Sequence, residues 1–182
     1  MKILNYQETI ALPHGVKATL ANTKIRISGP KGELEREIND PTIKVQTEPD
    51  KIIFIVKKLT KKQKTRLGTI KAHIKNMFKG VTQGHHYKLK ICSGHFPMNV
   101  TFSGNQLSVK NFLGEKVPRV LKIKQGVNVK IEGDIITLES IDKEACGQTA
   151  SAIELLMKRA DYDKRIFQDG IYIIDKDGKA VK

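Results

Sequence analysis

The chain repeats itself, and this repetition restricts its possible folds more than any other feature of the sequence. Residues 107–109 align with residues 25–27 at an offset of 82, and Val127 aligns with Ile43 at an offset of 84. In both halves several short strand-like segments precede one apolar helical segment. A shared order of elements at a nearly constant offset indicates internal duplication. The sequence therefore predicts two similar tandem domains.

Short segments rich in β-branched residues and separated by turn residues predict most of the secondary structure. The first twelve residues are expected to form a lead-in segment. Strands are expected in the first half at residues 16–20, 24–27, 33–38, 43–45 and 52–56, and in the second half at residues 87–91, 99–102, 107–109 and 127–129. The predicted fold class is α+β, in which each duplicated domain is a small antiparallel sheet packed against one helix.

Helix-start signals mark the end of each half. Thr60 and Gln63 have the spacing of a capping box, so a helix is expected from Lys61 to Lys79, with Gly80 as the residue that ends it. Asp142 is expected to cap the second helix. The apolar face of that helix is predicted to comprise Cys146, Ala150, Ile153, Met157 and Ala160.

These elements give a simple domain organisation. Residues 1–82 are expected to form the first α+β repeat domain and residues 83–160 the second. The last segment, residues 161–182, has no counterpart in the first half. It is predicted to be an extended C-terminal tail with a few anchoring side chains.

The chain is strongly basic. It has 33 Lys and Arg against 19 Asp and Glu, a formal net charge of +14. Residues 1–80 carry 17 basic and 7 acidic side chains, and the remaining residues carry 16 and 12. Such a charge predicts a polyanionic partner: a nucleic acid, an anionic membrane surface or an acidic protein.

The first predicted helix contributes much of this charge. Between Lys57 and Lys79 there are nine basic residues and no acidic residue. Lysines occupy the first helical turn, where the helix dipole favours acidic groups, whereas the second helix carries acidic residues there. A stripe opposite the apolar face comprises Lys64, Lys71, Lys75 and Lys79. The stripe is interpreted either as a solvated basic face or as a surface that binds phosphates, and the net charge favours the second interpretation.

Several other functional classes find little support. Aromatic residues make up 5% of the chain and Trp is absent, so base stacking is not expected to dominate recognition. No phosphate-binding loop or catalytic motif is present, and we expect neither an enzyme nor a cofactor. Glu115 follows a turn and is expected to pair with a neighbouring base. The Cys92 and His95 spacing is a weak signal for zinc, because Cys146 falls on an apolar helix face.

The N-terminal residues and the cysteine content suggest where the protein resides. The first seven residues lack the apolar run of a signal peptide, and the longest aliphatic or aromatic run, residues 52–56, is too short to span a bilayer. Two cysteines do not make a disulfide framework, so reduced thiols and a cytoplasmic location are expected. His85, His86 and His95 are expected in loops.

Four motifs, taken together and in order, resemble a known family. Residues 27–34, 76–84, 95–100 and 111–116 resemble the universal large-subunit ribosomal protein six, which is large-subunit protein nine in eukaryotes. Residues 167–172 resemble the ending of its eukaryotic and archaeal branch. The chain looks like a shortened eukaryotic form, because it lacks the Trp-containing insertion that eukaryotic relatives usually carry before the first helix. A separate departure from the family is His85, which stands where an aromatic residue is common.

The resemblance implies a duplicated two-domain fold and a role in the large ribosomal subunit. It implies binding to ribosomal RNA near the sarcin–ricin loop, beside the surface where translation factors dock, with neighbouring ribosomal proteins as further partners and with neither a membrane nor a small-molecule substrate. The protein would act in cytoplasmic ribosomes, after assembly in the nucleolus in a eukaryote. In the family the second domain and the tail make much of the RNA contact. Carried over to this sequence, the RNA-binding residues would be Lys110, Asn111, Lys116, Arg119, Arg159, Lys164 and Arg165, with Lys31 as a weaker candidate.

Two other functions stay open on the residues alone, namely an RNA-modifying enzyme and a basic protein-interaction module. An enzyme would require a pocket with convergent titratable groups. For the RNA-binding function, the sequence predicts that charge reversal at Lys116 and Arg165 weakens RNA binding more than reversal at Lys71 and Lys75.

Overall fold

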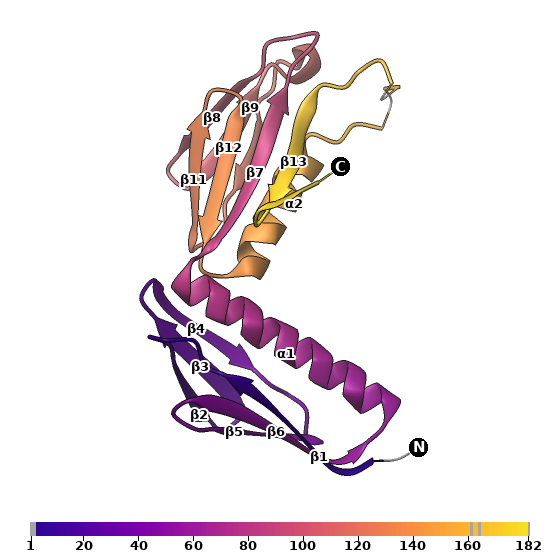
Figure 1. Cartoon of the computed structure of the whole chain (residues 1–182). Helices are drawn as coiled ribbons and strands as arrows, with labels where there is room; N and C mark the ends of the chain where they lie inside the picture. The colour runs from indigo at the N-terminus through magenta and orange to yellow at the C-terminus, as the bar shows by residue number, and fades with distance from the viewer. Residues whose placement is uncertain (1–2, 161, 164, 182) are drawn as a thin grey trace. The chain divides into compact units, whose positions relative to one another are not determined.

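A computed structural model describes residues 3–160, 162–163 and 165–181. The chain divides into two compact units between Gly84 and His85 (Figure 1). No helix in this described part of the chain combines the length and the apolar character that crossing a membrane requires.

The first unit consists of two three-stranded antiparallel sheets and one long helix (Figure 1). One sheet has the order β1-β6-β5 and the other the order β2-β3-β4. Its buried side chains include Ile25, Ile27 and Phe54 on the strands and Leu67 and Ile74 on the helix. Its elements are β1 (Ile3–Ala11), β2 (Lys17–Ala21), β3 (Lys24–Gly29), β4 (Gly32–Glu37), β5 (Ile43–Thr47), β6 (Lys51–Leu59) and α1 (Lys61–Thr82).

The second unit repeats this topology and extends it. Its sheets have the orders β10-β9-β8 and β11-β12-β7-β13-β14, so β7-β12-β11 repeats β1-β6-β5 and β8-β9-β10 repeats β2-β3-β4. The α+β class and the duplication are thereby confirmed. The elements are β7 (His85–Cys92), β8 (Asn99–Ser103), β9 (Gln106–Lys110), a short 3-10 helix (Phe112–Gly114), β10 (Arg119–Lys122), β11 (Val127–Glu132), β12 (Ile135–Ser140), α2 (Lys143–Leu156), β13 (Gly170–Lys176) and β14 (Lys179–Ala180).

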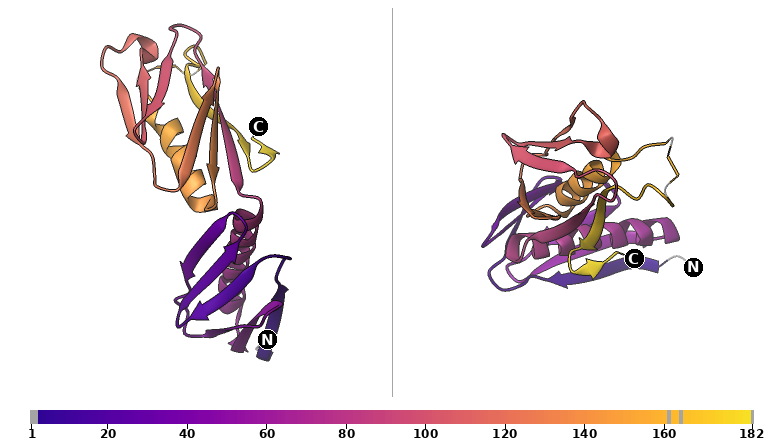
Figure 2. Two further views of the ribbon diagram at one scale, coloured as in Figure 1. Left: turned by 90° about the vertical axis from the view of Figure 1, so that its left-hand side faces the viewer. Right: turned by 90° about the horizontal axis from the view of Figure 1, so that it is seen from above.

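The core of the second unit forms around α2. The helix packs against β13, β7 and β12 on one side and against β10 on the other, and Figure 2 shows it between the strands of the two sheets. Leu89, Ile136, Leu138 and Ile153 have no exposed surface. The alternation of apolar residues along β7 and β12 places Leu89, Ile136 and Leu138 on the face that α2 covers. Ile153 of α2 belongs to the same core cluster.

The predicted helix starts are confirmed, and the predicted ends are not. Thr60 and Gln63 form the expected capping box, since each side chain binds the backbone amide of the other residue. However, Gly80 is buried inside α1, and the left-handed residue that follows the helix is Gly84, whose φ is +81°. The amide of Gly84 donates to the carbonyl of Gly80 over 3.0 Å, which satisfies a terminal carbonyl. Ala160 lies after the end of α2 and is exposed.

Three strand regions differ from the sequence-based expectation. The lead-in segment is strand β1, and the tail contains β13 and β14, so residues 161–182 are not simply an extended tail. Residues 119–122, which the sequence did not indicate as a strand, form β10. β1 pairs with β6 and β13 pairs with β7, each across a long stretch of sequence. Such pairings depend on tertiary contacts and leave little local signal.

Gly29 allows β3 to approach the end of α1 closely. A Cβ atom at this position would lie 2.8 Å from Cγ2 and 3.0 Å from the carbonyl oxygen of Val81. We therefore expect Gly29→Ala to lower the free energy of unfolding by about 2 kcal/mol, because the strand must move away from the helix. Urea unfolding followed by circular dichroism measures this change.

Gly68 provides the matched control for this prediction. A Cβ atom there would meet no atom within 4 Å, and the residue lies in an exposed part of α1. Gly68→Ala is expected to stabilise the protein by roughly 0.5–1 kcal/mol through its higher helix propensity. Equal effects of the two substitutions would show that the approach of β3 to α1 does not depend on Gly29.

Candidate nucleic-acid interface

The loop of residues 111–118 connects β9 to β10 and has an unusual backbone. In the first unit the equivalent connection, between β3 and β4, is only Pro30 and Lys31. Asn111, Leu113 and Gly114 have φ values of 62°, 47° and 76°, in the left-handed region. Leucine seldom adopts this conformation, and such residues are often found at functional sites. The side-chain amide of Asn111 donates to the carbonyl of Pro97 over 3.0 Å, which fixes the start of the loop.

Glu115 joins this loop to the end of α2. Its carboxylate accepts two hydrogen bonds of 2.7 Å from Arg119 and one of 3.2 Å from Arg159. The hydrogen bonds from Arg119 and the positive charges of both arginines lower the pKa of Glu115, although partial burial opposes them. The expected pairing of Glu115 with a neighbouring base is confirmed.

The two arginines that contact Glu115 also make other internal contacts. Arg119 donates to the carbonyl of Leu156 over 2.5 Å and lies 4.5 Å from the centre of the Phe112 ring. Arg159 lies 4.4 Å from the centre of the Tyr162 ring. Their side chains are 20% and 32% exposed. Arg119 and Arg159 therefore hold the loop against α2, which leaves less of each guanidinium for an external partner.

The remaining predicted RNA-binding residues differ in their surroundings. Lys110 and Lys116 are exposed, and neither makes an ion pair within the described part of the chain. Arg165 pairs with Asp163 over 3.0 Å yet stays 92% exposed. Lys164 lies outside the described residues. Lys31 belongs to the first unit, where its ammonium group donates to the carbonyl of Gln83. The structure thus brings Lys110, Asn111, Lys116, Arg119 and Arg159 together around one loop.

A cluster around Asp169 was not predicted. Its carboxylate, which is only 1% exposed, accepts hydrogen bonds from the Gly94 amide at 2.6 Å, the His95 amide at 3.0 Å and Nδ1 of His95 at 2.5 Å. Burial alone would raise the pKa of Asp169, but these hydrogen bonds outweigh burial and lower it. Phe167 lies against the His95 ring with centroids 4.7 Å apart, and Tyr162 meets Phe167 edge-on at 4.8 Å. The sequence signals were that Asp169 lies in the family-like ending and that His95 opens one of the four family-like motifs.

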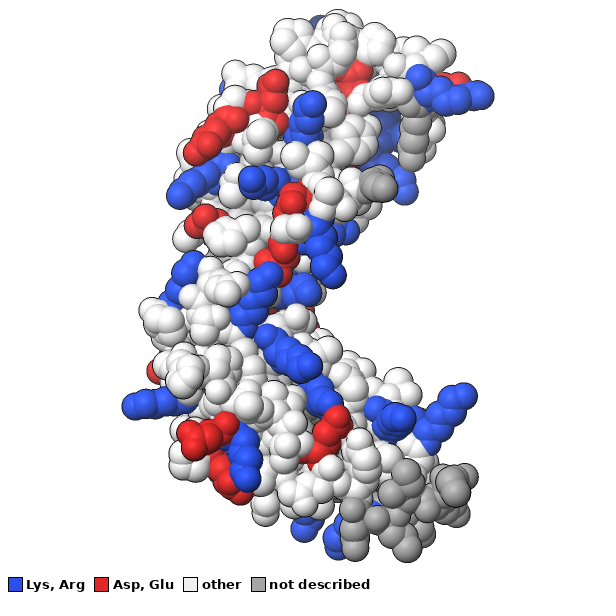
Figure 3. All heavy atoms as spheres, in the orientation of Figure 1, with Lys and Arg blue, Asp and Glu red and all other residues white. Residues whose placement is uncertain are grey.

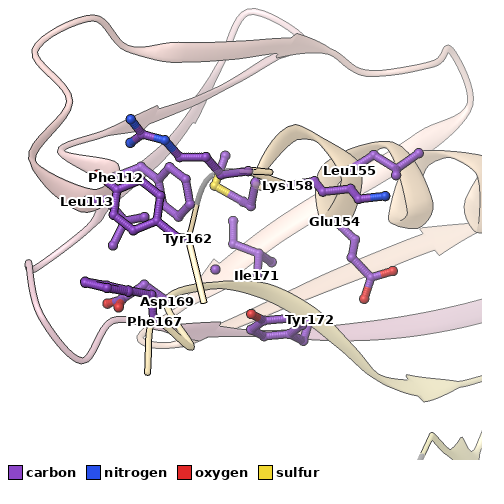
Figure 4. A pocket seen from close by; sticks show the side chains of 13 residues that line it. Phe112, Leu113, Glu154, Leu155, Lys158, Tyr162, Phe167, Asp169, Ile171 and Tyr172 are labelled. Atoms are coloured by element: carbon purple, nitrogen blue, oxygen red, sulfur yellow. The ribbon is translucent and has the colours of Figure 1, made fainter. Parts of the chain in front are cut away.

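A cavity of about 290 Å³ lies beside this cluster (Figure 4). Figure 4 shows Phe112, Tyr162 and Phe167 on one side of it and Leu155 and Glu154 of α2 on another. The faces of Tyr162 and Phe167 already contact Arg159 and His95. These contacts leave less of the two ring faces available for stacking on a base.

The histidines and cysteines do not have the surroundings that the sequence suggested. His85 is buried in β7 with Nδ1 2.9 Å from Asp177, and His86 follows it in the same strand, so neither is a loop residue. His95 is in a loop, as predicted. Cys146 lies in the core, where burial raises the pKa of its thiol to about 12. Among the described residues no group of His, Cys, Asp and Glu side chains has the arrangement of a metal site.

Comparison with known proteins gives a consistent result over both units. The family model of ribosomal protein L6 matches residues 12–84 and 96–170. The chain is 42% identical over 178 residues to large ribosomal subunit protein uL6 of Sulfurisphaera tokodaii. The aligned region covers 97% of this chain and 96% of that protein. It is 41% identical over 175 residues to uL6 of Methanococcus vannielii, covering 96% of each chain. It is also 41% identical over 169 residues to uL6 of Ignicoccus hospitalis, covering 90% of this chain and 91% of the relative.

Proposed function

The chain belongs to the ribosomal protein L6 family, and from this premise we propose that it is a structural component of the large ribosomal subunit that binds ribosomal RNA. It acts in ribosomes and is not an enzyme. Its basic composition and the match of the family model to both repeats support this function. Neighbouring ribosomal proteins are its further partners.

One observation carries the assignment of the RNA-binding surface to the second unit. Lys110 and Lys116 are exposed at either side of a loop whose conformation is fixed by Asn111 and Glu115. Because the backbone of this loop is already ordered, it loses little conformational entropy when a phosphate binds to its lysines. Arg165, which is 92% exposed, is a further cation that a phosphate can reach. We therefore assign phosphate contacts to Lys110, Lys116 and Arg165, and mainly positioning roles to Arg119 and Arg159.

The finer aspects of the proposal follow from the family resemblance. The RNA target lies near the sarcin–ricin loop, where translation factors dock, and the protein functions in cytoplasmic ribosomes. Phosphate contacts supply most of the affinity, and recognition of the folded shape of the RNA supplies the specificity.

The salt dependence of RNA binding tests this function. We expect the full chain to bind a large-subunit RNA fragment that contains the sarcin–ricin loop, with affinity that falls steeply as salt rises. With the three assigned phosphate contacts alone, the loss between 50 and 200 mM salt should be at least about 40-fold. Filter binding at several salt concentrations measures it. A flat salt response, or equal affinity for an unrelated duplex of the same length, would contradict the proposal.

A further inference from the structure

The duplicated units differ most at one edge of a sheet. In the second unit, β13 pairs with the outer edge of β7, and its side chains Ile171 and Ile173 are buried. The first unit has no equivalent strand: within its described residues, β1 pairs with β6 on one side and with no strand on the other. β1 is nine residues long. A long edge strand presents unpaired amide and carbonyl groups that accept another strand.

The helices differ at matching positions. The positions compared are the fourth, eighth, eleventh and fifteenth after each N-cap, which is Thr60 in the first unit and Asp142 in the second. In the second unit all four residues at these positions are buried. In the first unit three of the four are lysines. The strands that α2 contacts most are β13 and β7, whereas the strands that α1 contacts most are β3 and β4. The residues are Cys146, Ala150, Ile153 and Met157 in the second unit and Lys64, Gly68, Lys71 and Lys75 in the first.

As a result, a hollow lies between α1 and β1. It has a volume of about 340 Å³ and is lined by Tyr6, Glu8, Lys64, Leu67, Gly68, Lys71, Ala72 and Lys75. Lys71 pairs with Glu8 across it, whereas Lys64 and Lys75 are exposed and make no ion pair within the described residues. Figure 3 shows basic side chains following α1 on the face turned to the viewer, with an acidic group beside them. We name this hollow and the adjoining edge of β1 the β1 slot.

We propose that the β1 slot docks an extended, acidic segment of another protein, which adds a strand to β1 in the place that β13 takes beside β7. The backbone of the segment pairs with the free edge of β1. Every second side chain of an added strand faces α1. Acidic side chains at those positions meet Lys64 and Lys75.

The chemistry of the slot selects this partner. The lining contains Lys64, Lys71 and Lys75 but only one acidic residue, Glu8, so it carries a net charge of +2. This charge attracts a strand that carries carboxylates and repels a strand that carries basic side chains. The chain's own C-terminal strand, with apolar Ile171 and Ile173 facing its helix, does not match the lysines. A nucleic acid would match the charge but has no backbone groups with the spacing of a sheet edge, so strand addition favours a polypeptide.

A designed peptide tests the proposal with the full chain. The probe is an end-blocked octapeptide of alternating valine and glutamate, and the readout is the amide NMR spectrum together with hydrogen exchange. We expect shifts at β1 and at Lys64, Lys71 and Lys75, and slower exchange of the outward amides of β1. The same peptide with its alternate amides methylated should bind at least about tenfold more weakly, because it cannot pair with the edge.

Two charge-reversal variants complete the test. Lys64→Glu combined with Lys75→Glu should weaken peptide binding by at least about tenfold. Lys61→Glu combined with Lys62→Glu changes the net charge equally at exposed positions outside the slot, and should change the affinity less than threefold. Equal losses in both variants, or equal affinity of the methylated peptide, would overturn the proposal.

Two further outcomes would also overturn it. Absence of any peptide effect on β1 would mean that Glu8 and Lys71 are inward-facing charges that protect the edge from pairing. Tighter binding of a uridine dodecamer than of the peptide to the same residues would assign the slot to nucleic acid. The proposal is independent of the ribosomal RNA function: a failure of peptide binding leaves the salt-dependent RNA binding unchanged, and a failure of RNA binding leaves the peptide result unchanged.

Discussion

Asp169→Ala is expected to lower the free energy of unfolding of the second unit by about 3 kcal/mol. The substitution removes the acceptor for the Gly94 and His95 amides and for the His95 ring. These donors face a side chain that is only 1% exposed, so they lose their partner in a place that water barely reaches. Phe167, which lies against His95, then loses a fixed neighbour. Urea unfolding followed by circular dichroism and tyrosine fluorescence measures the loss.

Two comparison variants make the Asp169 prediction specific. Asp163→Ala removes an exposed carboxylate that pairs with Arg165, and is expected to cost no more than about 0.5 kcal/mol. Asp169→Asn keeps an oxygen acceptor for the amides but loses the charge, so about half of the alanine effect is expected. If Asp169→Ala costs no more than Asp163→Ala, Asp169 does not hold the 94–95 loop.

The pH dependence of the Asp169 effect has a defined sign. The pKa of Asp169 is lower in the folded state than its ordinary value, so its carboxylate stabilises the folded protein above about pH 4. That contribution is lost as the pH falls through the lowered pKa. The stability difference between the wild type and Asp169→Asn is therefore expected to be largest above pH 4 and to shrink at lower pH.

Reversing Lys116 and Arg165 to glutamate is expected to weaken binding to the large-subunit RNA fragment by about 100-fold at low salt. Both side chains are exposed, and each is assigned a phosphate contact that reversal turns into repulsion. The slope of log affinity against log salt should fall by about two, one for each lost contact. Filter binding across a salt series measures both quantities.

The structure refines the control for this experiment. The sequence suggested Lys71 and Lys75 as the comparison, but Lys71 pairs with Glu8, so its reversal also breaks an internal ion pair. Reversal of Lys64 and Lys75 changes the charge equally without that loss, and should weaken RNA binding less than fivefold. A larger loss in this variant than in the Lys116 and Arg165 variant would shift the main RNA-binding surface to α1.

Local signals identified most of the fold correctly. The capping box at Thr60 starts α1, and the apolar face with Cys146, Ala150 and Ile153 is buried in α2, because caps and amphipathic periodicity act within one or two turns. β1 and β13 escaped detection because each gains its stability from a distant partner strand. His85 was misplaced in a loop for the same reason, since the pairing of β7 with β12 and β13 determines its burial.

The candidate site was only partly predictable. The resemblance to the family pointed to Lys110, Asn111 and Lys116, which lie close together in the sequence. It did not distinguish the exposed lysines from Arg119 and Arg159, whose guanidinium groups contact Glu115 and aromatic rings. The contact of Asp169 with His95 joins residues 74 positions apart, and no local pattern encodes such a pairing.

By itself the sequence determined the duplication, the α+β class, the helix starts and the need for a polyanionic partner, because these follow from periodicity, caps and charge along the chain. Tertiary structure alone decided which cations stay exposed and which sheet edge stays open. Lys116 is exposed while Arg119 is held by Glu115. In the part of the chain that the structure describes, β13 covers the edge of β7, whereas no strand covers the edge of β1. The physical reason is that the exposure of a charge or a strand edge depends on what packs beside it in space, and those neighbours come from distant parts of the chain.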